Sequence, residues 1–282
     1  MIDLSNENVI HVKKNGIQFL QFRRLLEYQD ILIHAYSLGA DVNFRTARAN
    51  GQSFTEAEYK KALEDYTNLC RTLECKMENV VKTNQTHSDC VKVAKRKIKI
   101  DEPDFNLEEY SKTDGLITTK SNLILSTTNA DCILLMFFDS IKKVVANVHS
   151  GWKGTLQRIS VKAVRKMVAE FGSSPKDIIC CICPSIRKCH FEVEKEVEEL
   201  FRVEFNDILT GKDTDIIEEK VSGIKWNIDT VAINKILLER EGLKSENIID
   251  CGICSVCNSD LIHSYRVEKD GYGLETALIG LK

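Results

Sequence analysis

One cysteine and two histidines have the types and spacing of a metal site with catalytic chemistry. Cys132 and His149 flank a stretch that is typical of two strands, 133–138 and 144–148, joined by a short turn. Because the two ends of a hairpin return to the same edge of a sheet, we expect both residues to lie close together. With His87 they form a Cys/His/His set that suits zinc, with copper as the alternative metal. Three protein ligands leave one coordination position open, as in catalytic sites.

The same residues permit two kinds of chemistry. A metal would keep Cys132 as a thiolate and lower the pKa of a bound water, giving a nucleophile or base for hydrolysis or deamination. Without a metal, Cys132 activated by His149 or His87 is itself a candidate nucleophile. Asp131 either orients a ligand histidine or caps its own loop. Taken alone, Cys132 is more typical of a buried, inert thiol.

Four further residues are candidates for binding substrate. Gly151 and Lys153 precede a helix expected over 155–171, where a glycine lets the backbone approach a ligand and the helix N-terminus favours an anion. The alternative is a tight turn between a strand and a helix. Tyr265 and Arg266 offer an aromatic ring to stack a base and a guanidinium to bind phosphate or ribose.

The remaining cysteines include a C-x-x-C pair, Cys254 and Cys257, with Cys251 three residues before it. Such a pair can mark metal or redox chemistry. Because no second pair follows at zinc-ribbon spacing, we expect packed or free thiols. The same expectation applies to four cysteines in or beside a predicted strand: Cys180, Cys181, Cys183 and Cys189.

Strands and helices alternate irregularly along the chain. The pattern predicts a hairpin (9–12 and 17–22), helices over 55–73 (with Thr55 as N-cap), 155–171, 192–205 and 230–241, and strands over 31–36, 80–83, 115–118, 123–126, 178–183, 248–251 and 276–279. Since there is no strict βαβ alternation, we expect an α/β (α+β) fold of mixed sheets flanked by helices, forming a single domain over 1–282.

The composition excludes several classes of protein. Of 282 residues, 43% are hydrophobic and 29% charged, and the net charge of −3 provides no basic field for nucleic acid. The N-terminal residues lack the pattern of a signal peptide, and no apolar stretch is long enough to cross a membrane. We therefore expect a cytoplasmic protein with mostly reduced cysteines. The sequence leaves open whether it is a monomer or a homodimer.

Five ordered segments resemble one family, the YfiH-type proteins, also called the laccase-domain or peptidoglycan-editing-factor family and related to purine nucleoside phosphorylases. The segments that carry the resemblance are Gln85 with His87, Ala130-Asp131-Cys132, His149-Ser150-Gly151-Trp152-Lys153-Gly154, Pro184-Ser185-Ile186 and His263-Ser264-Tyr265-Arg266.

The resemblance implies a fold shared with cytotoxic-necrotizing-factor-like cysteine hydrolases. It also implies zinc-dependent phosphorolysis of adenosine, inosine or methylthioadenosine to base and ribose 1-phosphate, with adenosine deamination at the same site. The expected partners are thus a purine nucleoside and phosphate. Two rivals remain. A copper polyphenol oxidase is the family's older label, although 6 histidines are few for a coupled copper cluster. A peptidoglycan-editing cysteine or metal hydrolase is the other.

Two departures from the family pattern concern arginines. An Asn-Arg pair in the first long helix aligns with Asp65-Tyr66 here, so we expect Arg45 and Arg48 to take over an anion-binding role. The alternative is a solvated basic loop. The family's Gly-Arg near the C-terminus reads Gly273-Leu274.

Overall fold

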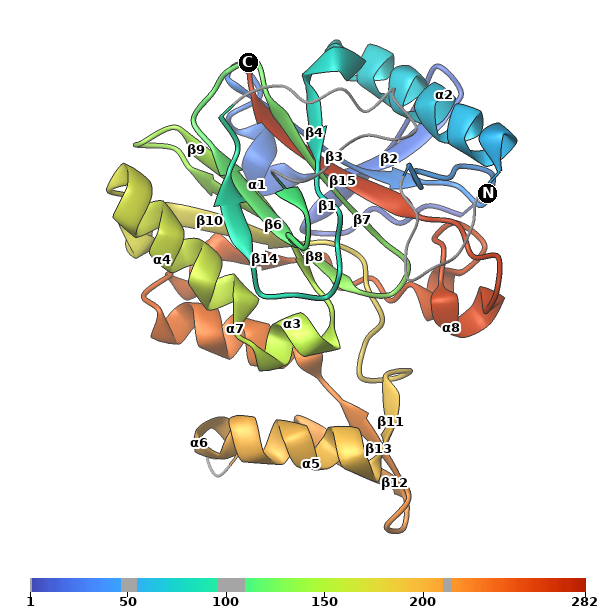
Figure 1. Cartoon of the computed structure of the whole chain (residues 1–282), viewed down its shortest axis with the longest axis vertical. Helices are drawn as coiled ribbons and strands as arrows, with labels where there is room; N and C mark the ends of the chain where they lie inside the picture. Colours follow the sequence, from blue (N-terminus) through green and yellow to red (C-terminus); the bar gives the residue numbers. More distant parts are fainter. Residues whose placement is uncertain (1, 47–54, 96–109, 210–214) are drawn as a thin grey trace.

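Two six-stranded β-sheets packed face to face form the framework of the protein (Figure 1). The computed structural model describes residues 2–46, 55–95, 110–209 and 215–282. The first sheet contains, in spatial order, β1 (Val9–Lys14), β2 (Ile17–Phe22), β3 (Leu32–Leu38), β15 (Glu275–Leu281), β7 (Ile124–Asn129) and β4 (Val80–Lys82). The second contains β14 (Ile248–Asp250), β10 (Ile178–Ile182), β8 (Ile133–Asp139), β9 (Val144–Ser150), β6 (Gly115–Thr118) and β5 (Val91–Val93).

Alternation of side chains along the strands divides the core into layers. On β8, Leu134 and Met136 face the first sheet, whereas Leu135 and Phe137 face α4 (Ile159–Phe171) and α7 (Thr230–Arg240). The outer face of the first sheet is covered by α2 (Glu56–Thr72). The order of layers is therefore helix, sheet, sheet, helices, which explains why the central strands are apolar on both faces.

A smaller unit projects from one end of this sandwich, at the bottom of Figure 1. Its three strands are β11 (Glu192–Glu194), β13 (Lys225–Ile228) and β12 (Ile217–Val221), and its helices are α5 (Lys195–Glu204) and α6 (Asn206–Leu209). They pack around Phe201, Phe205 and Trp226. The remaining short helices are α1 (Arg23–Leu26), α3 (Trp152–Leu156), α8 (Tyr265–Glu268), η1 (Met77–Asn79), η3 (Pro175–Asp177), η4 (Ser245–Asn247) and η5 (Val256–Asn258).

The predicted α/β fold of mixed sheets and flanking helices is confirmed. The first hairpin turns at Asn15 and Gly16, both at positive φ, as an Asn-Gly turn requires. Thr55 caps α2 in a reciprocal capping box with Glu58. Each six-stranded sheet combines antiparallel with parallel pairs, for example β4 beside β7 and β14 beside β10.

Two predicted helices were wrong in their extent. The helix expected over 155–171 begins earlier, at Trp152, and is broken at Arg158, whose φ of 56° lies in the left-handed region. The helix expected over 192–205 begins only at Lys195, because residues 192–194 form β11. Val193 pairs there with Trp226, a distant partner that local helical spacing does not reveal. Within the described ranges, none of the helices has the length and apolarity required to traverse a bilayer.

Candidate metal centre and its cavity

The chain passes twice from the first sheet to the second at one end of the sandwich. The passage from β4 to β5 carries His87, and the passage from β7 to β8 carries Cys132. Both passages leave the same end because β4 and β7 run parallel. His149 lies near the end of β9, paired with Leu134 of β8, so the hairpin returns it beside Cys132 as predicted.

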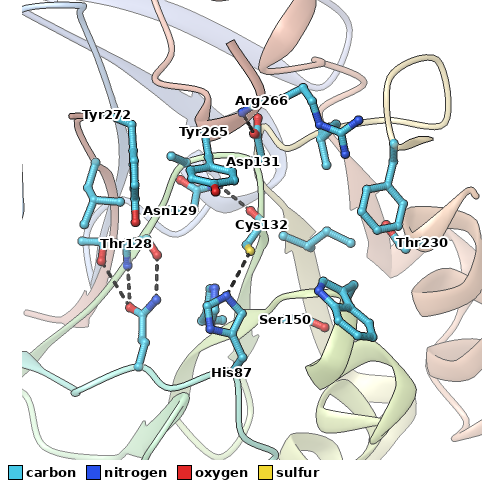
Figure 2. Close-up of a pocket in the computed structure, with 18 of the residues that line it drawn as sticks. His87, Thr128, Asn129, Asp131, Cys132, Ser150, Thr230, Tyr265, Arg266 and Tyr272 are labelled. Atoms are coloured by element: carbon cyan, nitrogen blue, oxygen red, sulfur yellow. Dashed lines mark hydrogen bonds between the residues drawn. The ribbon is translucent and has the colours of Figure 1, made fainter. Parts of the chain in front are cut away.

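The three predicted ligands converge. Their donor atoms all lie within 4.8 Å of one another, and Cys132 Sγ lies 3.7 Å from His87 Nε2. Figure 2 shows these two side chains pointing toward each other. Zinc bonds of about 2.0–2.3 Å at tetrahedral angles place donor atoms roughly 3.3–3.8 Å apart. The Cys/His/His set therefore fits a zinc ion with little movement.

Asp114, which the sequence did not single out, orients the ring of His149 and holds the backbone of His87. Its Oδ1 lies 2.8 Å from Nδ1 of His149 and accepts a hydrogen bond from the backbone N–H of His87 at 3.1 Å. Because Asp114 occupies Nδ1 of His149, Nε2 is the nitrogen left for a metal. In the sequence, Asp114 stands out only as an aspartate directly before the buried strand β6. Because it lies far from His149 along the chain, the sequence alone does not predict their contact.

The loop that carries His87 is held in an unusual backbone conformation. His87 has a φ of 58°, in the left-handed region that non-glycine residues seldom adopt. The loop is tied to Thr128 by both ends of the Gln85 amide, which accepts from Thr128 N–H at 2.8 Å and donates to Thr128 O at 2.7 Å (Figure 2). Thus Gln85 of the family-like Gln-x-His segment positions the histidine. The strand predicted over 80–83 ends at Lys82, so His87 lies five residues beyond β4, within the passage between the sheets.

The protonation states of these side chains depend on one another. Burial would raise the pKa of Cys132, but the positive charge of His149 and hydrogen bonds from both histidines lower this pKa to about 6. Burial would lower the pKa of His149, but the charge of Cys132 and the hydrogen bond with Asp114 raise it to about 10. Burial would likewise raise the pKa of Asp114, yet its contact with His149 lowers it. Metal-free protein would therefore hold a thiolate beside an imidazolium near neutral pH.

The carboxylate of Asp131 does not contact either ligand histidine. Its Oδ1 accepts from Ser255 Oγ at 2.6 Å, and its Oδ2 accepts from the backbone N–H of Arg266 at 2.7 Å. Neither expected role matches these contacts, since Asp131 does not cap its own loop but joins the cysteine loop to the distant segments that carry Ser255 and Arg266. The histidine-orienting contact belongs to Asp114 instead.

The glycine and lysine of the His-x-Gly-Trp-Lys-Gly segment lie in different surroundings. Gly151 is buried, and a Cβ added to it would lie 2.7 Å from His87 Cδ2 and 3.2 Å from Cys132 Sγ. Lys153 is exposed, with its ammonium 5.4 Å from the ring centre of Trp152, and it does not line the cavity. The expected anion-binding role of Lys153 has no support in this geometry.

A cavity of about 820 Å³ opens beside the three ligands. Tyr265, Arg266 and Tyr272 lie across it from His87 (Figure 2). Tyr265 is 52% exposed, and its ring meets that of Tyr272 edge to face at 5.2 Å. Arg266 also donates to Glu192 O of β11, so the small unit forms one wall. The predicted aromatic and guanidinium groups therefore both reach the cavity.

Two basic side chains line the same cavity. Arg45 stacks its guanidinium 4.4 Å from the ring centre of Tyr272 and donates to Tyr272 O at 2.9 Å. Lys82, which sequence reasoning missed, is buried and donates to Phe44 O at 2.7 Å. Burial and the charge of Arg45 lower the pKa of Lys82 to about 7. The sequence did offer one indication of a functional lysine, because Lys82 stands in an apolar strand shortly before Gln85. Arg48 lies outside the described residues.

Comparisons with known proteins show the family and the fold. The family model described as "Multi-copper polyphenol oxidoreductase laccase" matches residues 44–282. Purine nucleoside phosphorylase YlmD of Bacillus subtilis is 31% identical over 60% of the chain, and the match spans 59% of that protein's own length. Adenosine deaminase RL5, from an unknown prokaryotic organism, is 31% identical over 73% of the chain and 76% of that protein. The crystal structure of Bacillus licheniformis hypothetical protein YfiH superposes with a TM-score of 0.80 at 22% identity, covering 95% of this chain and 100% of that chain, which shows a shared fold.

Replacing Asp114 should weaken metal binding without removing a ligand. We expect Asp114→Asn to reduce zinc affinity about 10- to 100-fold, because the amide cannot hold the His149 tautomer as a carboxylate does. Competition with a chromophoric chelator measures that affinity. Asp131→Asn is the matched control, since Asp131 contacts neither histidine, and its zinc affinity should stay near that of the wild type. Equal losses in both variants would contradict the role given to Asp114.

The lowered pKa of Cys132 predicts a pH profile for metal-free protein. The thiolate persists above its pKa, so alkylation by iodoacetamide should be retained down to pH 6 and be lost as the pH falls further. An ordinary thiol would instead lose reactivity below about pH 8.5. Mass spectrometry of the peptide that contains Cys132 separates this reaction from those of other cysteines, and zinc added first should protect it. A midpoint above pH 8 would contradict the thiolate–imidazolium pair.

Proposed function

The chain belongs to the family described as multi-copper polyphenol oxidoreductase laccase, and from this premise we propose that it is a zinc-dependent purine nucleoside phosphorylase with adenosine deaminase activity. The observation that carries the proposal is the convergence of His87, Cys132 and His149 at one open cavity. Relatives named purine nucleoside phosphorylase and adenosine deaminase, each 31% identical, support the same substrate class.

The histidine inventory favours this function over copper oxidase chemistry. All 6 histidines lie within the described residues. His34 is buried and its Nε2 accepts from Phe22 N–H, and His263 contacts both Val42 O and Glu268. Each of these two histidines is thus engaged elsewhere. The cavity itself holds two histidines, far fewer than a coupled copper cluster would need.

Each wall of the cavity suits one part of the proposed substrates. The exposed ring of Tyr265 offers a stacking surface for a purine. Lys82 and Arg45 offer a basic site for phosphate, because Lys82 uses one of its three N–H donors on Phe44 O and, among the described residues, makes no second hydrogen bond. We propose that phosphate held there attacks C1′ of the ribose while the purine leaves.

His87, Cys132 and His149 would hold the metal. A zinc ion bound by them would supply Lewis-acid chemistry and a water of lowered pKa, which deamination requires. Asp114 keeps His149 in the required tautomer, and Asp131 positions the backbone of Arg266 at the cavity. We also propose that residues 1–282 act as one catalytic domain, because the cavity draws its lining from Arg45 through Leu274.

Substrate assays on wild type and Cys132→Ala test the proposed function. We expect purified protein to release purine from nucleosides when phosphate is present and to convert adenosine to inosine. Cys132→Ala should lose both reactions and its catalytic zinc while keeping the circular dichroism of the wild type. Oxygen uptake with phenols would instead support an oxidase, and serine release from a muropeptide precursor would support the cell-wall hydrolase. Full turnover by Cys132→Ala would show that the reaction takes place at a different site.

The phosphate site can be tested apart from the metal. Replacing Lys82 by methionine keeps the length of the side chain but removes a charged donor, which costs about 2 kcal/mol, or roughly 30-fold in KM for phosphate. Deamination uses no phosphate, so Lys82→Met should leave it within about twofold of wild type.

Lys153→Met is the matched control for this lysine substitution. Lys153 is exposed and does not line the cavity, so neither reaction should change. If Lys82→Met reduced phosphorolysis and deamination equally, Lys82 would have a structural role only. If Lys153→Met alone raised the KM for phosphate, the anion site would lie at α3 instead.

A further inference from the structure

Four potential metal ligands gather at a second position, away from the His87, Cys132 and His149 centre. Cys189 and His190 follow β10, and Cys254 and Cys257 follow β14. All four donor atoms lie within 4.8 Å of one another. From the sequence we expected packed or free thiols here. The C-x-x-C pair finds its partners in a segment about 65 residues earlier, a pairing that spacing along the chain does not reveal.

The separations between donor atoms match those around one tetrahedral ion. Cys189 Sγ lies 3.7 Å from Cys254 Sγ and 4.0 Å from Cys257 Sγ. His190 Nδ1 lies 3.6 Å from both Cys254 Sγ and Cys257 Sγ, and 3.2 Å from Cys189 Sγ. Zinc–sulfur bonds of about 2.3 Å and zinc–nitrogen bonds of about 2.0 Å give roughly 3.8 Å between sulfurs and 3.5 Å between sulfur and nitrogen. All of these distances are close to the expected values.

The fold holds the two ligand segments side by side. β10 and β14 are parallel neighbours, so the chain leaves both strands at the same edge of the sheet. Ser185 and Cys254 then form an isolated β-bridge. Arg187 donates two hydrogen bonds to the carboxylate of Asp250, at 2.6 and 2.9 Å, which locks one segment to the other. The four ligands are thus brought together by strand pairing and by an ion pair between their two segments.

We propose that Cys189, His190, Cys254 and Cys257 bind a second zinc ion in a closed, structural site. Three thiolates and an imidazole fill all four tetrahedral positions, so no position stays open for a substrate. A disulfide would use two of the sulfurs and would not explain why a third sulfur and Nδ1 of His190 point to the same spot. The soft donor set also disfavours magnesium or calcium, which prefer oxygen.

A hydrogen bond connects the second site to a residue that lines the cavity. Ser255, between two of the ligands, donates to Asp131 Oδ1 at 2.6 Å, and Asp131 precedes Cys132. A zinc ion at the second site would therefore fix the loop that supports Asp131 and the Arg266 backbone. Its role would be to hold this end of the sandwich rigid, and the proposal does not depend on which reaction the cavity performs.

Zinc analysis of full-length protein tests the second site. Protein purified after brief dialysis against a chelator should hold two zinc ions per chain by elemental analysis. Cys257→Ser should lose one equivalent, Cys132→Ala should lose the other, and the double variant should lose both. Cys75→Ser is the matched control, because Cys75 is a half-buried cysteine in the connection between α2 and η1, and it should keep the wild-type content.

X-ray absorption on Cys132→Ala gives an independent readout that leaves the second site intact, should Cys257→Ser fail to fold. The remaining zinc should show a shell of three sulfurs and one nitrogen. The proposal is overturned if Cys132→Ala retains no zinc, if the shell is rich in nitrogen and oxygen, or if Cys257→Ser keeps the full zinc content. A disulfide between Cys254 and Cys257, located by non-reducing peptide mapping, would also overturn it.

Discussion

A buried carboxylate, Asp114, is the constraint around which the candidate metal centre is built. Burying a charge is unfavourable unless hydrogen bonds compensate it. Here five donors do so: the backbone N–H groups of Thr86, His87 and Ser88, the hydroxyl of Ser88 and the ring of His149. The same contacts hold the His87 loop in its left-handed turn and set the orientation of His149. Satisfying one buried charge therefore also places two of the three ligands.

The sandwich of two sheets explains how residues distant in sequence meet at this point. Each passage between the sheets must turn at the end of the strands, where backbone groups are free to face a ligand. His87 and Cys132 occupy two such passages, and the small unit around β11 closes the space beyond them. The polar ligands thus lie at the ends of the strands, while the apolar core between the two sheets excludes water.

Some of this arrangement was predictable from the sequence because it depends on local pattern. The hairpin from Cys132 to His149 followed from two apolar runs and a turn, and the start of α2 followed from the Thr55 cap. What the sequence did not reveal depends on contacts between distant segments. Asp114 directly precedes β6 and meets His149 on the neighbouring strand β9, and Cys189 meets Cys254 because β10 and β14 are parallel neighbours. β11 likewise forms by pairing with β13, a segment that is distant in the sequence.

The metal centre requires a glycine at position 151, and this requirement can be checked in other proteins with the same fold. The space above its Cα is already filled by the imidazole of His87 and the sulfur of Cys132, so even a methyl group would overlap with them. A chain that shares this sandwich but has a larger residue at the equivalent place would have no room for the same trio of donors. The residue at the position of Gly151 therefore indicates whether a protein with this fold has room for the same three metal ligands.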